Sequence, residues 1–116
     1  MKSTVSLKEN HLFRRLYQRG KTAADGRLAL YARPNGQRKN RLGLTVSTKL
    51  GHAVVRNRTR RRLREIYRIH EEQLIRGTDL VVVARVRADH SSFHQLEQSF
   101  LRLAEKLDLL KKGETP

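Results

Sequence analysis

The segment from Arg56 to Arg68 constrains this chain most, because it combines a dense run of charge with the apolar spacing of a helix. Seven of its thirteen residues are arginine and one is acidic. A side chain suited to the core recurs every three or four residues, as on one face of a helix: Val55, Thr59, Leu63, Ile66, His70 and Leu74. We therefore predict a helix that packs one side on a core and ends near Arg76 and Gly77.

The polar residues fall on another face of this predicted helix. At about 100° per residue that face lies roughly 130° from the apolar stripe, and it consists of Asn57, Arg60, Arg61, Arg64 and Arg68. A guanidinium fork binds phosphate bidentately and keeps its charge at physiological pH. The face is therefore typical of a helix that binds a polyanion, and we predict a nucleic acid.

Other basic side chains extend this predicted surface. Arg56 and Arg58 occupy the first helical turn, where free amide N–H groups and the helix dipole also attract phosphate. Lys49 and His52 lie in the turn just before the helix. Arg62 falls toward the apolar edge, so we expect it to brace the fold instead.

The charge of the chain supports this interpretation. Its 26 basic and 11 acidic residues give a net charge of +15. Residues 1–40 carry ten basic and two acidic side chains, residues 41–76 carry ten and three, and residues 77–116 carry six of each. The excess charge therefore belongs to the first two thirds, as expected for a protein that binds nucleic acid.

Composition excludes several classes of protein. The chain has no cysteine, so disulfides and cysteine-based zinc sites are excluded. It has no apolar run of 18 residues and no apolar segment typical of a signal peptide near its start, so we expect a cytoplasmic protein without a membrane partner. A length of 116 residues predicts one domain, with a core over about 6–110 and a frayed tail at 111–116.

The remaining pattern predicts an α+β fold. A first helix is expected over 11–19, capped by Asn10 or by a competing Ser6–Glu9 capping box, and closed by Gly20. Alternating or wholly apolar runs predict strands at 27–33, 41–47 and 80–84. Ser91 or Ser92 begins a last helix with an apolar stripe through Leu110. The order is helix, two or three strands, helix, strand, helix, with a four-stranded sheet covered by helices.

The candidate catalytic groups do not form a site in the sequence. Protein nucleases need clustered carboxylates for metal ions or a positioned pair of histidines, whereas the acids here are scattered. His90 and His94 are one helical turn apart and could hold a metal, but a surface pair at a helix start is the favoured interpretation. We predict no catalytic residue and no protein-bound metal.

An ordered motif between Leu42 and Glu65 resembles the protein subunit of bacterial ribonuclease P. Its parts are a strand, a Lys-x-Gly-x-Ala-Val turn and an Arg-Asn-Arg helix, which here are Lys49, Gly51, Ala53, Val54, Arg56, Asn57 and Arg58. The aromatic first helix, the strand at 80–84 and the last helix also occur in the expected order, so the resemblance covers about residues 6–110.

The resemblance implies a subunit of a ribonucleoprotein endoribonuclease. The RNA subunit would carry the active site and the Mg²⁺ ions, and the complex would remove the 5′ leader from precursor tRNA. The implied partners are ribonuclease P RNA and precursor tRNA, and no protein partner is implied. The resemblance also implies a left-handed crossover from the strand at 41–47 through the arginine helix to the strand at 80–84. General topology rules predict the opposite hand.

Phe13, Tyr17 and Tyr31 have two interpretations. Aromatic rings four residues apart are usually core, but Leu12, Leu16, Leu28 and Leu30 already supply an apolar face on each element. Unpaired bases stack on such rings for about 1–3 kcal/mol each. The resemblance implies that these three rings line a cleft for the single-stranded leader.

Two other functions fit parts of the pattern. A ribosomal or other structural RNA-binding protein would share the charge and the arginine helix, without a role in cleavage. A DNA-binding regulator could place the arginine helix in a major groove, but such proteins usually dimerise, and the sequence has no heptad seam for it.

Overall fold

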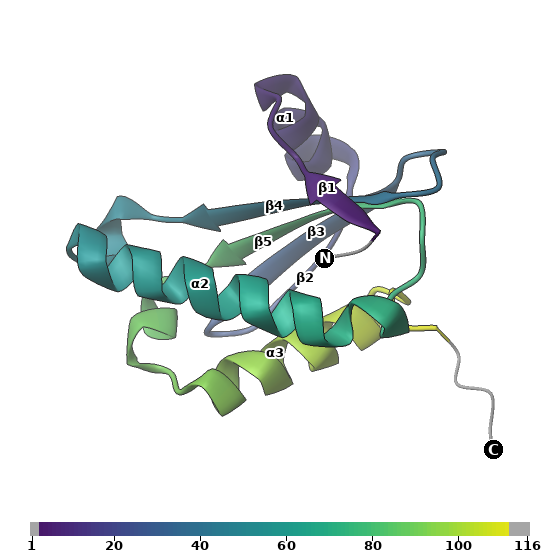
Figure 1. The fold of residues 1–116 in the computed structure, drawn as a ribbon. Helices are drawn as coiled ribbons and strands as arrows, with labels where there is room; N and C mark the ends of the chain where they lie inside the picture. Colours follow the sequence, from purple (N-terminus) through teal and green to yellow (C-terminus); the bar gives the residue numbers. More distant parts are fainter. Residues whose placement is uncertain (1–2, 112–116) are drawn as a thin grey trace, which may run out of the picture.

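A computed structural model describes residues 3–111, in which one mixed sheet lies between helices (Figure 1). Among these residues the sheet has five strands in the order β1-β4-β5-β3-β2. The elements along the chain are β1 (Thr4–Ser6), α1 (Asn10–Arg19), β2 (Lys21–Ala24), β3 (Leu28–Pro34), β4 (Asn40–Val46), the 3₁₀ turn η1 (Thr48–Leu50), α2 (Ala53–His70), η2 (Glu71–Gln73), β5 (Thr78–Ala84), η3 (Val86–His90) and α3 (Phe93–Lys106). No helix in the described part is long and apolar enough to cross a membrane.

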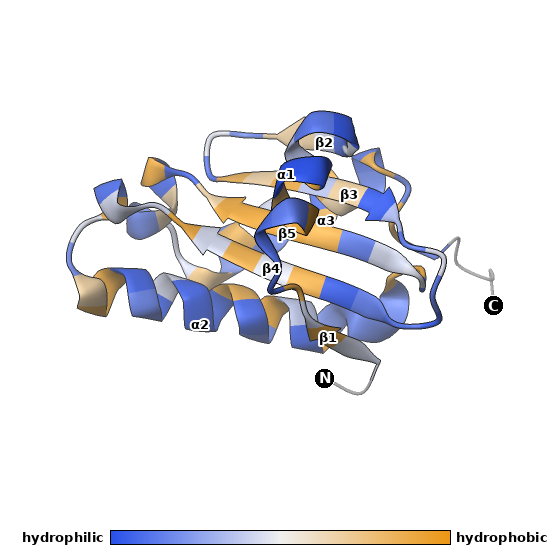
Figure 2. Cartoon of the chain, turned by 90° about the horizontal axis from the view of Figure 1, so that it is seen from above, coloured by the Kyte–Doolittle hydropathy of each residue, from blue (hydrophilic) through white to orange (hydrophobic). Residues whose placement is uncertain are grey.

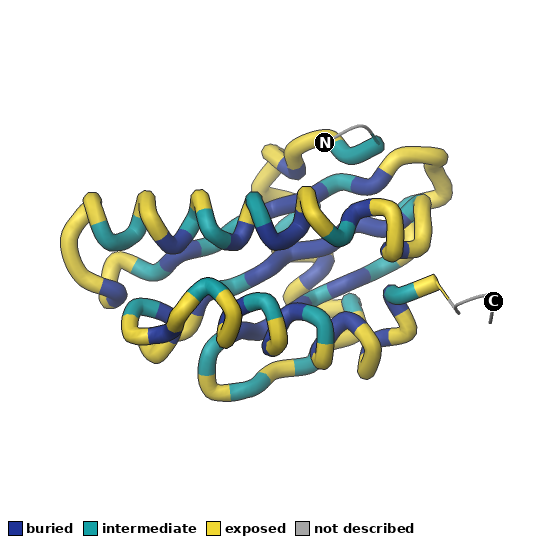
Figure 3. Tube along the Cα trace, turned by 60° about the horizontal axis from the view of Figure 1, so that its bottom comes forward, coloured by how far each residue is buried: buried dark blue, intermediate teal, exposed yellow. Residues whose placement is uncertain are grey.

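The main core lies between one face of the sheet and the helices α2 and α3, as the buried stripes in Figure 3 show. Alternate residues of each strand point to this face because successive side chains of a strand point in opposite directions. The central strands contribute Leu30, Leu42 and Val82, and the helices contribute Ile66 and Phe100, all of them buried. The apolar stripe predicted for the arginine helix is therefore confirmed.

The opposite face of the sheet carries α1, which crosses the strands in Figure 2. A smaller apolar cluster of Leu7, Leu16 and Val81 joins this helix to the sheet. Leu12 and Phe13 pack partly against the same cluster. Because one ten-residue helix cannot cover a five-stranded face, polar and aromatic side chains beside α1 reach solvent.

The strands β4 and β5 pair in parallel, with Leu42 opposite Leu80 and Leu44 opposite Val82. A parallel pair needs a crossover connection, which α2 supplies on the face of the main core. Figures 1 and 2 together show a left-handed crossover. The expectation drawn from the family resemblance is confirmed, and the general rule would have failed here.

A buried polar network joins the ends of these elements. The Asn40 side-chain amide donates to the carbonyl of Ile75 at 3.1 Å and to the Tyr67 hydroxyl at 3.3 Å, and its oxygen accepts from the Thr78 amide at 2.9 Å. The Tyr67 hydroxyl is hydrogen-bonded to Thr4 at 2.8 Å. Burial raises the pKa of Tyr67. The network therefore fixes α2 against β1, β4 and the start of β5.

Several predicted boundaries are wrong. In the described part of the chain the sheet has five strands rather than four, because the three- and four-residue edge strands β1 and β2 add to it. The arginine helix ends at His70 rather than near Arg76, since the chain turns through η2 and becomes extended at Leu74. That turn brings Leu74 into the core.

The helix ends also differ in part from expectation. The N-cap of α1 is Glu9, and neither Asn10 nor Ser6 caps it, whereas Gly20 does close it. The N-cap of α3 is Ser92, with the full capping box through Gln95.

The last helix stops earlier than its apolar stripe predicts. It ends at Lys106, and the positive φ of 56° at Asp108 turns the chain so that Leu110 pairs with Leu74. At Lys111, the first residue of the predicted frayed tail, the backbone amide donates to the carbonyl of Gln73 at 2.7 Å. The rest of the predicted tail, 112–116, lies outside the described residues.

The turn between β2 and β3 depends on an ionised Asp25. Its carboxylate accepts from the amides of Arg27 at 2.8 Å and Leu28 at 2.9 Å, and from the Arg102 guanidinium at 2.8 Å. Burial alone would raise the pKa of Asp25, but the hydrogen bonds from these groups outweigh it and hold the pKa well below its usual range.

We predict that Asp25→Asn destabilises the protein by about 1–3 kcal/mol at pH 7, the usual scale for hydrogen bonds to a charged group. Since the folded-state pKa is lowered, the stabilisation is complete above the unfolded pKa of about 4 and is lost as the pH falls below it. Denaturant unfolding of both proteins at pH 7 and at about pH 2.5 measures the two effects. The lower pH is roughly one unit or more below the unfolded-state pKa of Asp25. The exposed Glu105→Gln is the control, and an equal loss for Asp25→Asn at both pH values would contradict the prediction.

Candidate nucleic-acid interface

The arginines of α2 point in three directions. Arg58 and Arg62 turn toward the segment around η3, where Arg58 lies 3.7 Å from the Asp89 carboxylate. The Arg62 guanidinium donates to the carbonyl of Ser91 at 3.2 Å. The prediction that Arg62 braces the fold is confirmed.

A second group faces solvent. Asn57, Arg61, Arg64 and Arg68 are exposed along the helix, and Arg60, which is half-buried, donates to the Asn57 side-chain oxygen at 3.2 Å. The Arg68 guanidinium also donates to Glu65, one turn earlier, at 3.0 Å. This bond lowers the pKa of Glu65 and raises that of Arg68. The Arg68 fork is therefore partly occupied.

The start of α2 gathers the other predicted basic residues. Lys49 lies in η1 and His52 is the N-cap residue of the helix, and both are exposed. Arg56 in the first turn is half-buried, and its Nε has no hydrogen-bond partner among the described residues. The structure thus brings Lys49, His52 and Arg56 to one end of α2, next to its free amide groups.

Arg60 and Arg64 of the solvent-facing group also border a groove of about 240 Å³, and the sequence did not predict that these arginines would lie beside a cleft ring. The groove runs between α1, the β1–β4 edge of the sheet and α2, and its lining consists of Val5, Ser6, Leu7, Phe13, Leu42, Gly43, Leu44, Arg60 and Arg64. We call it the α1–α2 groove. It joins one of the predicted cleft rings to two of the predicted phosphate-binding arginines.

Gly43 lets Phe13 approach the sheet closely. A Cβ atom on Gly43 would lie 2.7 Å from two atoms of the Phe13 ring, closer than van der Waals contact allows. The ring therefore lies directly on the backbone of β4. A glycine within a strand pattern often marks such an approach, so the Leu42-Gly43-Leu44 run held a signal for this part of the site.

The three predicted cleft rings lie together. The ring centroids of Phe13 and Tyr17 are 6.4 Å apart, and those of Tyr17 and Tyr31 are 4.9 Å apart in an edge-to-face arrangement. The Tyr17 hydroxyl is hydrogen-bonded to Thr45 at 3.3 Å, yet 42% of this residue is exposed. Phe13 and Tyr31 are half-buried against the small cluster that includes Val81. The rings thus form an aromatic surface that is supported below and open above.

Several histidines and acids make local contacts with each other. The His70 ring is hydrogen-bonded to Glu97 on α3 at 2.9 Å, so this histidine of the predicted apolar stripe has a polar partner. His94 lies 3.9 Å from the same carboxylate group. Within residues 3–111, no three His, Asp or Glu side chains are grouped in a way that could hold a metal ion.

Comparisons with known proteins bear on this surface. The family model described as ribonuclease P matches residues 1–108. The ribonuclease P protein component of Natranaerobius thermophilus is 39% identical over 113 residues, which cover 97% of this chain and 98% of that protein. The corresponding protein of Caldanaerobacter subterraneus is 41% identical over 110 residues, or 95% of each chain.

Solved structures agree in fold. The Staphylococcus aureus RNase P protein superposes with a TM-score of 0.84 at 30% identity, covering 91% of this chain and 97% of that one. The Thermotoga maritima RNase P protein gives a TM-score of 0.76 at 28% identity, covering 84% and 92%. The same α+β architecture is therefore shared over most of the chain. This chain belongs to the ribonuclease P protein component family, the protein subunits of the endoribonuclease that processes the 5′ end of tRNA.

Proposed function

We propose that this subunit uses two adjoining surfaces to hold two RNAs. The single-stranded 5′ leader of precursor tRNA lies on Phe13, Tyr17 and Tyr31 and in the α1–α2 groove, and ribonuclease P RNA binds the outward face and the start of α2. The RNA subunit carries the active site and its Mg²⁺ ions, and the complex works in the cytoplasm. The observation that carries the proposal is the groove that Phe13 and two arginines share.

The chemistry of the groove suits a single strand. Exposed rings can stack on unpaired bases without regard to sequence, and guanidinium groups beside them can follow the phosphates. Bases in a helix are already stacked and paired, so an aromatic surface gains little from duplex RNA. The half-buried Phe13 and Tyr31 are held by the sheet, and this support reduces the entropy lost when a base stacks on them.

The groove also divides the arginines between the two RNAs. Arg60 and Arg64 were predicted to bind the RNA subunit, but they line the groove beside Phe13. We assign them to leader phosphates. Arg61 and Arg68 lie farther around the helix and, with the residues at the start of α2, remain for the RNA subunit. The alternative of a structural RNA-binding protein without a role in cleavage is not favoured, since the family acts in tRNA processing.

We predict that Tyr17→Ala weakens holoenzyme binding of precursor tRNA with a long leader by about 1–3 kcal/mol, the value of one stacked base. Its exposure means that the fold should lose little stability. Equilibrium binding of substrates with long and very short leaders measures the effect, and Ile69→Ala, an exposed apolar residue of α2, is the control. Equal losses for both leaders would show that the ring only packs.

A pair of double variants tests the division of the arginines. Arg60→Ala with Arg64→Ala should reduce the salt dependence of leader binding, by a log–log slope of about 0.7 for each lost phosphate contact to a single strand. Arg61→Ala with Arg68→Ala should instead weaken binding of ribonuclease P RNA. Titrations of each RNA across a salt series separate the two effects. The reverse pattern would contradict the assignment.

We also predict that protein free of nucleic acid leaves precursor tRNA intact when Mg²⁺ is present. Adding it to ribonuclease P RNA at limiting Mg²⁺ should raise the rate of leader removal, because a positioned leader holds the substrate on the RNA. Gel analysis of end-labelled substrate measures both reactions. Cleavage by the protein alone would disprove the placement of the active site on RNA.

A further inference from the structure

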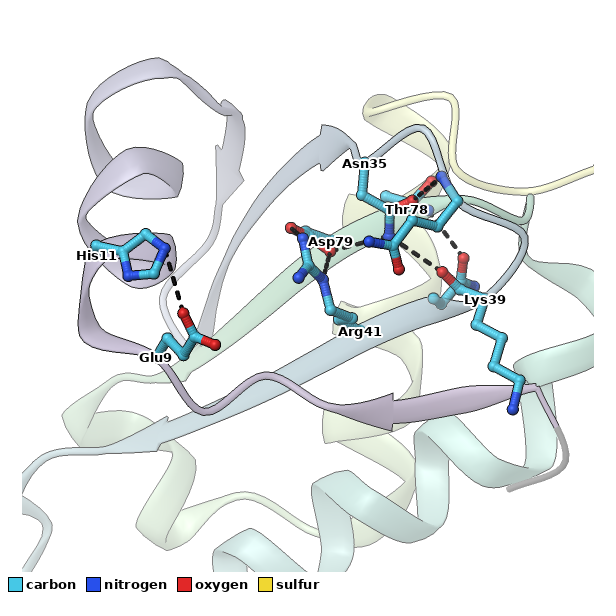
Figure 4. Close-up of polar contacts among 9 residues, drawn as sticks. Glu9, His11, Asn35, Lys39, Arg41, Thr78 and Asp79 are labelled. Atoms are coloured by element: carbon cyan, nitrogen blue, oxygen red, sulfur yellow. Dashed lines mark hydrogen bonds and ion pairs between the residues drawn. The ribbon is translucent and has the colours of Figure 1, made fainter.

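A row of three charged residues crosses the sheet on the face that carries α1. In the strand register Asp79 of β5 lies opposite Arg33 of β3 on one side and Arg41 of β4 on the other. The Asp79 carboxylate accepts two hydrogen bonds from Arg41, both at 2.7 Å, and one from the Asn35 amide at 3.0 Å, as Figure 4 shows. Asp79, the acid among these three residues, therefore forms its ion pair with Arg41.

Arg33 has no such partner. Its Nη1 is buried, and no atom in the described part of the chain accepts a hydrogen bond from it. A buried donor without an acceptor usually costs about 1–3 kcal/mol, and more when it is charged. An acceptor from outside the chain would remove that cost.

The side chain of Arg33 borders a pocket of about 240 Å³ beside α1. Arg15 of α1 and Arg41 also line it, together with Leu12, Leu16 and Asp79. Three guanidinium groups thus surround the space with one carboxylate. Arg15 is exposed, and no ion pair of its side chain occurs within residues 3–111. The pocket therefore has an excess of positive charge and unused donors, which suits an anion.

This pocket is separate from the α1–α2 groove. At about 100° per residue, Arg15 lies roughly 160° around α1 from Phe13, with Leu16 between them facing the sheet. Phe13 and Arg15 therefore project from opposite flanks of α1. The lining residues of the pocket and of the groove have no member in common.

We infer that the pocket of Arg15, Arg33 and Arg41 binds a phosphate group of an RNA strand, as a contact additional to the α1–α2 groove and the arginine face of α2. A guanidinium cluster with one unused buried donor matches a phosphodiester, which offers two unesterified oxygens. The net charge of +8 over residues 1–40, all outside the arginine helix, is the excess expected for a further nucleic-acid contact. The inference that the pocket binds an anion is independent of the proposed function, whereas the assignment of that anion to RNA rests on it.

The nearest competing acids do not fill the pocket. Glu9 lies 3.3 Å from His11 at the start of α1 (Figure 4), is exposed, and is absent from the lining. A carboxylate of a protein partner would present the same kind of acceptor to these donors. RNA is favoured because the family assembles with RNA.

The first test titrates the full chain with inorganic phosphate and follows the arginine Nε–H signals by NMR. We expect the Arg33 signal to shift and saturate, and Arg33→Met and Arg15→Met to weaken phosphate binding several-fold. Arg38→Met removes the same charge from an exposed position outside the pocket and should have no effect. Arg33→Lys, which keeps the charge but not the fork, should restore part of the binding. The proposal would be overturned if the Arg33 signal did not shift with phosphate, or if Arg33→Met and Arg38→Met lost the same affinity for phosphate.

The second test measures the salt dependence of binding to ribonuclease P RNA and to precursor tRNA. Arg15→Met, on an exposed helix position that leaves the fold intact, should lower the log–log slope for one of them by about 0.7–0.9, and Arg38→Met should not. Phosphate binding without any change of slope would show a site for free anions only and would overturn the RNA assignment. A competing acidic peptide that displaces phosphate while RNA does not would overturn it too. Neither result depends on leader length. A failure of the phosphate-pocket proposal can therefore be distinguished from a failure of the proposed leader-binding surface.

Discussion

The parallel pairing of β4 with β5 is the constraint on which the rest of the structure depends. Parallel neighbours cannot be joined by a tight turn, so the chain between them must cross one face of the sheet as α2. The helix with the densest positive charge is thereby fixed against the main core, with Leu63 and Ile66 inward and its arginines at the edge and outside. Together α2 and α3 cover this face of the sheet, and α1 packs on the opposite face.

Much of this fold could be predicted because its signals are local. The apolar stripe of α2, the alternation in β3 and β4 and the capping box at Ser92 all depend on residues close in the sequence. The edge strands could not be predicted this way, because β1 has three residues and acquires its role only by pairing with β4. The end of α2 at His70 depends on Leu74 reaching the core, which is likewise a tertiary effect. The handedness of the crossover came from the family resemblance and not from pattern.

The candidate site was predictable as two lists of residues but not as one surface. A helical wheel separates arginines from the apolar stripe, and a strand alternation separates Tyr31 from Leu30. Neither pattern contains the strand order that places β4 and β1 beside both α1 and α2, so the groove shared by Phe13 and Arg60 was missed. Arg33 was missed for a related reason, because only the register across three strands shows that its acidic neighbour is occupied by Arg41.

The neutrality of residues 77–116 has a kinetic consequence. The whole of α3 and the turn η3 before it lie in this part of the chain, and the Arg102 guanidinium of α3 is paired with Asp25. A polyanion approaching through solution is therefore attracted by the first two thirds of the chain and much less by α3. Such asymmetry orients a protein before contact and raises the rate of productive collision, an advantage that fades as salt screens the charges. Short-range stacking and hydrogen bonding then govern how long the complex lasts.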